Sequence, residues 1–287
     1  MRFRTEIEQP LAGFTIDRDR PLLLLGSCFS DNIGSRLDRD GFETMINPFG
    51  ALYNPFSIAK LLDRVASGET YTRYDLTPGP RGWHCLDFST TFSGSDPDRL
   101  LSEINSTMDS LKDFLSKSPV VIITFGTAFY FRHIPSGSRP VGNCHKFPAQ
   151  EFLRSRMSVA NIVDRWNPIC TDLHDSGCNL IFTVSPIRHL ADGLHGNNLS
   201  KSTLLLAVDS LLSKAVGDYF PAYEAVIDDL RDYRFYAADM KHPSETAGDY
   251  IYELFCNTYF SPATMTAALE SRRQFLRSSH RPILPSD

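Results

Sequence analysis

The chain has 287 residues, 42% of them hydrophobic, and carries a formal net charge of -5. It is long enough for one large domain or two small ones and can bury a sizeable core. No block of Lys and Arg argues for nucleic-acid binding, and the longest apolar runs, 22–25 and 120–124, are too short to span a bilayer.

The predicted elements alternate between short apolar runs and longer amphipathic stretches. Continuous apolar runs predict strands that are buried on both faces, and apolar residues at helical spacing predict helices. In chain order we expect a strand at 22–25, helices at 31–38, 55–65 and 98–115, a strand at 120–125, a helix at 157–174, a strand at 179–184, a helix at 198–216, a strand at 225–227 and a helix at 244–259. Pro168 is expected to kink or break its helix, and Pro243 suits a first helical turn. The intervening loops at 40–56, 68–97 and 126–150 are long enough to be functional or flexible.

This alternation predicts an α/β fold with a mostly parallel sheet that helices cover on both faces. No strong linker interrupts the chain, so we expect one domain at 1–265 and a C-terminal tail at 266–287. Sheets of this kind bind ligands at the carboxyl ends of their strands. Three predicted strands are followed there by residues that could form a site: Ser27, then Gly126 with Thr127, then Arg188 with His189.

The cysteines and the start of the chain predict the compartment. The six cysteines are irregularly spaced and form no Cys-x-x-Cys pair, which is typical of free thiols in a reducing compartment. The first six residues lack the apolar stretch of a signal peptide. We therefore expect a cytoplasmic protein without a nucleic-acid or membrane partner.

A turn near the end of the chain predicts acid–base chemistry. Asp239 stands three residues before His242, so one short turn can hold a carboxylate against an imidazole and fix the tautomer of that base. Ser27 would supply the nucleophile, at a helix N-terminus that stabilises negative charge. Plainer interpretations stay open, because Ser27 and Asp239 also suit helix capping. Cys28 is a competing nucleophile, or else a small buried residue on the helix face.

The segment Gly26-Ser27-Cys28-Phe29-Ser30 resembles the GSCFA signature, which names a family of bacterial proteins. Further matching blocks lie at 47–50 with 54–55, 124–128, 143–146, 185–189 and 239–243, so the resemblance covers about residues 1–260. The family is similar to the SGNH or GDSL hydrolases. The resemblance implies a flavodoxin-like three-layer α/β/α fold and a metal-free esterase, lipase or carbohydrate deacetylase. It implies Ser27 as nucleophile, His242 as base and Asp239 as the carboxylate that orients the base.

The resemblance also implies an oxyanion hole, and here the chain departs from the pattern. Those hydrolases use the N–H groups of the serine and of a glycine, for which Gly50 is the candidate, together with an Asn side chain. The Asn belongs to a Gly-x-Asn-Asp segment, which reads Gly126-Thr127-Ala128-Phe129 in this chain. Losing one oxyanion donor costs about 10²–10³ in rate. Thr127, Asn143 and His145 are candidate replacements, and Asn143 is the best chemical match.

Arg188 and His189 follow the third strand at the same rim. Arg188 would hold an anionic substrate group, such as a carboxylate or phosphate, and His189 would polarise a carbonyl. The alternative for Arg188 is a structural ion pair with Asp192 or with the Asp228–Asp229 pair.

Three other functions stay open. Transfer of an acyl group to another alcohol uses the same intermediate as hydrolysis, and Ala128 favours a non-catalytic binding protein. The pairs His84–Cys85 and Cys144–His145 offer soft metal ligands, but without the spacing of a zinc site. We therefore expect a small-molecule or carbohydrate ester as substrate, and neither a metal nor another cofactor.

Overall fold

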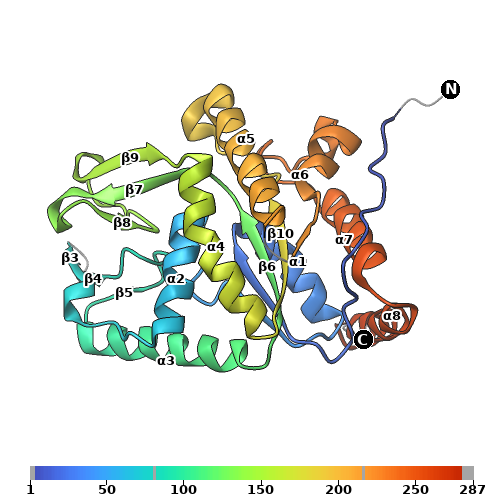
Figure 1. The fold of residues 1–287 in the computed structure, drawn as a ribbon, viewed down its shortest axis with the longest axis horizontal. Helices are drawn as coiled ribbons and strands as arrows, with labels where there is room; N and C mark the ends of the chain where they lie inside the picture. Colours follow the sequence, from blue (N-terminus) through green and yellow to red (C-terminus); the bar gives the residue numbers. More distant parts are fainter. Residues whose placement is uncertain (1–3, 80–81, 215–216, 280–287) are drawn as a thin grey trace, which may run out of the picture.

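A five-stranded parallel sheet forms the centre of the computed structural model, which describes residues 4–79, 82–214 and 217–279 (Figure 1). Its strands are β1 (Leu22–Gly26), β2 (Thr44–Ile46), β6 (Val120–Phe125), β10 (Asn179–Val184) and β11 (Asp218–Tyr219). They lie in the order β11-β10-β6-β1-β2, and every neighbouring pair is parallel. Taken in chain order, this is the 2-1-3-4-5 arrangement of flavodoxin-like folds, so the predicted fold class is confirmed.

Helices cover both faces of this sheet and complete three layers. One face packs against α2 (Pro55–Ser67), α4 (Val159–Asp175) and α5 (Gly193–Leu212), with α3 (Pro97–Leu115) beside α2. The other face packs against α1 (Cys28–Arg39), α7 (Glu245–Tyr259) and α8 (Pro262–Ser279). Within β1, Leu23 and Leu25 face the first layer, whereas Leu22 and Leu24 face the second. The continuous apolar run follows from this burial on both sides.

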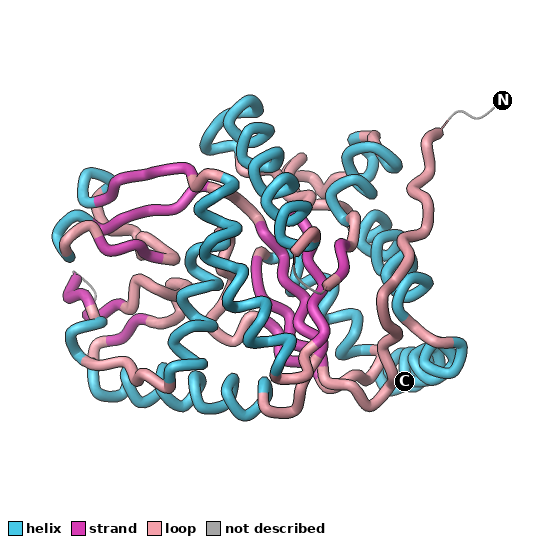
Figure 2. The backbone as a smooth tube through the Cα atoms, viewed as in Figure 1, coloured by secondary structure: helices cyan, strands magenta, loops and turns pink. Residues whose placement is uncertain are grey.

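Two small antiparallel sheets lie largely within the predicted loops at 68–97 and 126–150, with one strand just after the second loop. One contains β3 (Thr77–Gly79), β4 (Gly82–His84) and β5 (Ser93–Gly94), and the other contains β7 (Phe129–His133), β8 (Arg139–Val141) and β9 (Phe152–Arg156). Figure 2 shows both at one end of the molecule, beside the central sheet. Short 3-10 turns accompany them at Arg73–Asp75, Ile134–Ser136 and Ala149–Glu151.

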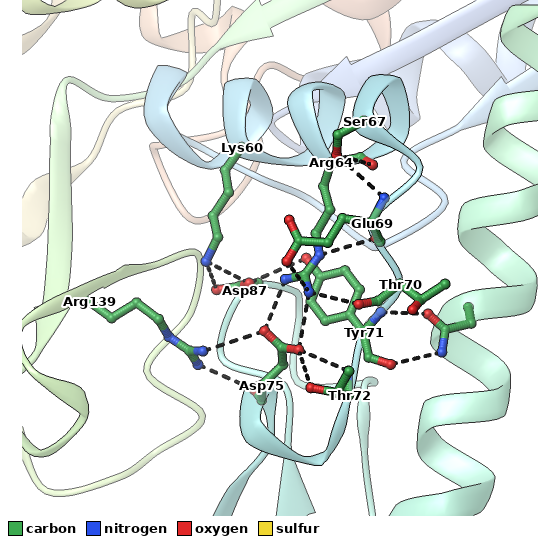
Figure 3. A network of polar contacts seen from close by, with 11 residues as sticks. Lys60, Arg64, Ser67, Glu69, Thr70, Tyr71, Thr72, Asp75, Asp87 and Arg139 are labelled. Atoms are coloured by element: carbon green, nitrogen blue, oxygen red, sulfur yellow. Dashed lines mark hydrogen bonds and ion pairs between the residues drawn. The ribbon is translucent and has the colours of Figure 1, made fainter.

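A buried arginine ties the first small sheet to α2 (Figure 3). The Arg64 guanidinium donates to both carboxylate oxygens of Asp75, at 3.0 and 3.1 Å, and lies 3.7 Å from the centre of the Tyr71 ring. Nearby, Lys60 donates to Asp87 over 2.7 Å, and the Tyr71 hydroxyl donates to the same carboxylate. These bidentate and charge-assisted bonds hold a segment that has little regular structure of its own.

Three sequence expectations are corrected. The apolar run at 225–227 is helical: it lies in the π-helix Ala225–Leu230, which follows α6 (Ala222–Glu224), and its buried side chains pack against α7 rather than extend the sheet. Helix α4 continues through Pro168 without a break. Helix α5 begins earlier than predicted, after the 3-10 turn Leu190–Asp192, while residues 215–216 of the predicted helix lie outside the described residues.

Helices α7 and α8 form the C-terminal part of the described chain. Pro243 lies just before α7 rather than in its first turn, because Ser244 caps the helix by accepting a hydrogen bond from the Ala247 N–H. Helix α8 runs across the predicted boundary at residue 265, and Ala268 is buried in the second core layer. The end of the predicted tail, 280–287, lies outside the described residues. A further 3-10 turn, Tyr233–Phe235, precedes the Asp239–His242 segment.

Candidate active site

The carboxyl ends of three adjacent strands bring distant segments to one edge of the sheet. Gly26 of β1 pairs with Thr124 of β6, which also pairs with Thr183 of β10, so the residues after each strand emerge together. Gly26 has a φ of 140°, and a Cβ there would lie 2.1 Å from the Thr124 carbonyl oxygen. Only glycine therefore allows β1 to turn into α1 at this point, which fixes where Ser27 and Cys28 stand.

Asp239 and His242 form the pair that their spacing predicted. The turn is closed by Met240, with a φ of 58°, and Asp239 Oδ1 accepts the N–H groups of Lys241 and His242 at 2.9 and 3.0 Å. Asp239 Oδ2 lies 2.5 Å from His242 Nδ1. The backbone and ring hydrogen bonds from His242 lower the pKa of Asp239 below its usual range. An ionised carboxylate only accepts hydrogen bonds, so Nδ1 carries the proton and Nε2 is left as a base.

The free ring nitrogen faces Cys28 rather than Ser27. The Cys28 sulfur lies 3.7 Å from His242 Nε2, and the Cys28 side chain is partly exposed. Ser27 is 1% exposed and serves as the N-cap of α1, where its Oγ accepts the Phe29 N–H at 3.3 Å. Among the described residues, no hydrogen bond joins Ser27 to His242. The structure therefore gives Ser27 the capping role that the sequence left open.

The backbone donors expected for the oxyanion hole are already occupied. The Gly50 N–H donates to the Asn47 carbonyl at 2.7 Å, and the N–H groups of Gly126 and Thr127 donate to the Tyr53 carbonyl at 2.8 and 2.9 Å. The Thr127 hydroxyl lies 3.1 Å from the Ser200 hydroxyl. These bonds hold the loops that border the site, so the Gly50 and Gly126 amides are structural in this conformation.

Asn143 and His145 are likewise committed to the loop after β8. Asn143 Oδ1 accepts the His145 N–H at 2.8 Å. The buried His145 ring lies between His84 Nδ1, at 3.2 Å, and the Phe88 carbonyl, at 3.0 Å. Burial lowers the pKa of His145, so its ring is neutral at physiological pH. Two of the three candidates for replacing the missing Asn thus pack against the segment of the first small sheet.

Tyr53 is a site residue that the sequence did not single out. Burial, followed by the interaction with Cys28, raises the pKa of Tyr53, and the Tyr53 hydroxyl interacts with the Cys28 thiol, whose own pKa burial raises. The Tyr53 ring also meets His189 edge-on, with the ring centres 5.7 Å apart. The hydroxyl stays protonated and is a donor beside the Cys28 sulfur. A lone tyrosine between two Asn-Pro blocks carries no chemical signature that would have identified it.

His189 reaches the same edge from the loop after β10. Its Nε2 is buried and has no hydrogen-bond partner among the described residues, and a Cβ added to Gly126 would lie 3.3 Å from it. Burial, reinforced by Lys201, lowers the pKa of His189 to about 4. The ring is therefore neutral at physiological pH and can donate or accept one hydrogen bond.

Arg188 lies beside the turn that holds Asp239 and His242. Its N–H donates to the Lys241 carbonyl at 3.4 Å, and its guanidinium lies 4.6 Å from the Tyr236 ring centre and 5.6 Å from that of Tyr233. Two of the three acidic partners considered for it pair with other arginines, Asp192 with Arg154 and Asp229 with Arg4. Among the described residues Arg188 has no carboxylate partner, so its charge is available to a ligand.

A buried lysine that the sequence analysis did not single out stabilises the carboxyl ends of two central strands. Lys201 of α5 is 1% exposed, and its Nζ donates to the carbonyls of Gly126 and Ser185, each at 2.6 Å. These carbonyls follow β6 and β10, so the ammonium clamps the two strand ends together. Burial lowers the pKa of Lys201 to about 7.

Among the described residues, no cluster of three or more His, Cys, Asp or Glu side chains is arranged to hold a metal ion. The described part of the chain contains no helix with the length and apolarity of a membrane span.

The chain is similar to a known family and to a solved structure. The model of the GSCFA family matches residues 21–255. A solved structure of a carbohydrate esterase family 2 enzyme with its carbohydrate-binding domain, from Corynascus thermopiles (Myceliophthora fergusii), aligns with a TM-score of 0.40 and 12% sequence identity, over 91% of this chain and 68% of that one. A search of curated proteins found no match.

Proposed function

Since the chain belongs to the GSCFA family, we propose that it is an acyl hydrolase of the SGNH type, which cleaves an ester or O-acyl bond through an acyl-enzyme. The observation that carries this proposal is the Asp239–His242 pair, whose 2.5 Å contact leaves the outer ring nitrogen directed at the N-terminus of α1. An oriented imidazole beside a nucleophile at a helix N-terminus is the arrangement that acyl transfer requires.

In this proposal His242 is the general base and then the general acid. It takes the proton of a nucleophile from the Ser27–Cys28 pair, returns it to the leaving alcohol, and activates the water that releases the acyl group. Asp239 keeps Nδ1 protonated and stabilises the imidazolium. The Tyr53 hydroxyl takes the place of the absent Asn side chain as an oxyanion donor.

The chemistry uses no metal or organic cofactor. The family resemblance favours a small O-acyl group, with acetyl on a carbohydrate as one example, and Arg188 favours substrates that carry an anionic group. Acyl transfer to a second alcohol would use the same intermediate, with the alcohol in place of water.

The test compares the wild type with His242→Ala on aryl acetates, acyl thioesters and O-acetylated sugars. We expect the variant to lose about 10²–10⁴ in kcat/KM. His174→Ala is the matched control, because that histidine is exposed at the far end of α4 and should not affect the rate. If the wild type hydrolyses none of these compounds faster than His242→Ala, the hydrolase proposal fails and a binding protein becomes the better interpretation.

A further inference from the structure

We propose that Cys28, and not Ser27, is the nucleophile, so that the site is a Cys–His–Asp triad. This inference rests on the proposed function and identifies the group that forms the acyl-enzyme. The contacts form one chain, from Asp239 Oδ2 to His242 Nδ1 at 2.5 Å and from His242 Nε2 to the Cys28 sulfur at 3.7 Å. A distance of 3.7 Å suits a thiol, because sulfur is larger than oxygen and its hydrogen bonds are longer.

The two candidate nucleophiles differ in what their side chains do. Ser27 is 1% exposed, and its Oγ already satisfies the Phe29 N–H as the N-cap of α1. To attack a substrate, Ser27 would have to give up this cap, which is typically worth about 1 kcal/mol, and leave a buried position. Cys28 is partly exposed and needs no such rearrangement. Access and geometry therefore favour the same residue.

The position of Cys28 also provides the oxyanion site. Cys28 is the first residue of α1, where backbone N–H groups have no intrahelical acceptor and the helix dipole favours negative charge. An acyl carbon bonded to the Cys28 sulfur would place its oxygen near this N–H and the Tyr53 hydroxyl. The N–H is held by the helix backbone before the substrate arrives, as electrostatic stabilisation of a tetrahedral intermediate requires.

The resting thiol is neutral in this arrangement. Burial, followed by the nearby Asp31 carboxylate, raises the pKa of Cys28. The site is therefore not a preformed thiolate–imidazolium pair, and the proton must move to His242 Nε2 as the sulfur attacks. This predicts slow alkylation by iodoacetamide at neutral pH, together with fast acylation by a substrate that fits the site.

The proposed reaction has two halves, acylation of Cys28 and hydrolysis of the resulting thioester. The sulfur forms a bond to the acyl carbon while His242 accepts the thiol proton, and the tetrahedral intermediate collapses by breaking the carbon–oxygen bond of the ester. The leaving alkoxide takes the proton from His242, which leaves a thioester on Cys28. Water then attacks the thioester as His242 removes one of its protons, and the carbon–sulfur bond breaks. The carboxylic acid leaves, and the sulfur recovers its proton from His242.

The first test locates the acyl group. Wild-type protein is mixed with an aryl acetate, quenched in acid, and digested for peptide mass spectrometry. We expect an acetyl group on Cys28 that neutral hydroxylamine removes, as it does from thioesters. An acetyl group on Ser27 would overturn the assignment. This measurement uses the unaltered chain, so it does not depend on how any variant folds.

The second test compares matched variants. Cys28→Ala should lose at least about 10³-fold in kcat/KM, while Ser27→Ala should lose less than about tenfold through its weakened helix cap. Cys144→Ala is the control, since Cys144 is also partly exposed but lies in the loop after β8. Full activity in Cys28→Ala together with inactive His242→Ala would refute the thiol nucleophile and keep the hydrolase. Equal rates in the wild type, Cys28→Ala and His242→Ala would instead refute the proposed function.

Discussion

Lys201→Met tests the clamp behind the site. The ammonium is fully enclosed and donates to two carbonyls, those of Gly126 and Ser185, at 2.6 Å each. Methionine keeps a similar length and volume but removes both donors. Leaving a buried acceptor unsatisfied costs about 1–3 kcal/mol, so the two carbonyls together cost about 2–6 kcal/mol in free energy of unfolding.

In the wild type, burial of the Lys201 charge lowers the free energy of unfolding by an amount that depends on pH. Burial lowers the pKa of Lys201 from 10.5 to about 7, so above pH 7 the folded protein holds this amine neutral while the unfolded chain keeps it protonated. The unfolded state then binds more protons, and stability rises with pH across this window. Each pH unit is worth about 1.4 kcal/mol, which amounts to on the order of 4 kcal/mol between pH 7 and 10. Below pH 7 both states are protonated, so stability no longer changes with pH through this group and the full cost of burying the charge remains.

The assay is urea denaturation of both proteins at about pH 6 and about pH 9.5, with the free energy of unfolding from linear extrapolation. The difference between wild type and Lys201→Met should be small or even reversed at the lower pH and should grow by several kcal/mol at the higher one. Lys112→Met on the exposed face of α3 is the control for losing a lysine. A difference that stays constant or shrinks as pH rises would refute this account of the buried amine.

Three further predictions concern the reaction. Asp239→Asn should turn an amide N–H toward His242 Nδ1 and favour the wrong tautomer, which lowers kcat for ester hydrolysis by about 10²–10⁴. A loss of kcat below tenfold would contradict the orienting role of Asp239. Tyr53→Phe should lower kcat by about 10²–10³ with little change in KM, whereas an increase confined to KM would argue against an oxyanion donor. Arg188→Met should reduce the preference for carboxylated over neutral esters by about 10- to 100-fold in competing substrate pairs, and equal losses on both substrates would show that Arg188 supports the turn instead.

The sheet could be predicted because its main strands are buried on both faces. A strand with one exposed face alternates apolar and polar residues, whereas continuous apolar runs are found in Leu22–Gly26, Val120–Phe125 and Asn179–Val184. The edge strands β2 and β11 have three and two residues, too few to show a pattern. The small antiparallel sheets are also short, and they are held by tertiary contacts such as those of Arg64 rather than by local preference.

The candidate site likewise has a part that local sequence determines and a part that only the fold determines. The Asp239–His242 pair is local, because the carboxylate caps the backbone of its own turn and needs no distant residue to place it. The identity of the nucleophile is not local. At the junction of β1 and α1 one residue decides whether a side chain caps the helix, as Ser27 does, or faces the imidazole, as Cys28 does. Tyr53 comes from another segment, and only the fold brings it to Cys28.

The electrostatics of the edge favour chemistry that creates charge only during the reaction. Burial raises the pKa of Cys28 and lowers those of His189 and Lys201, so each of these shifts favours the neutral form. Asp239 is the exception, and it keeps its charge through hydrogen bonds from its own turn rather than through burial. In the proposed reaction the thiol proton moves to His242, so the imidazolium would form directly against this carboxylate while the negative charge passes to the helix N-terminus. The site therefore stabilises charge separation in the transition state more than in the resting enzyme, which is the condition for a raised rate rather than tighter substrate binding.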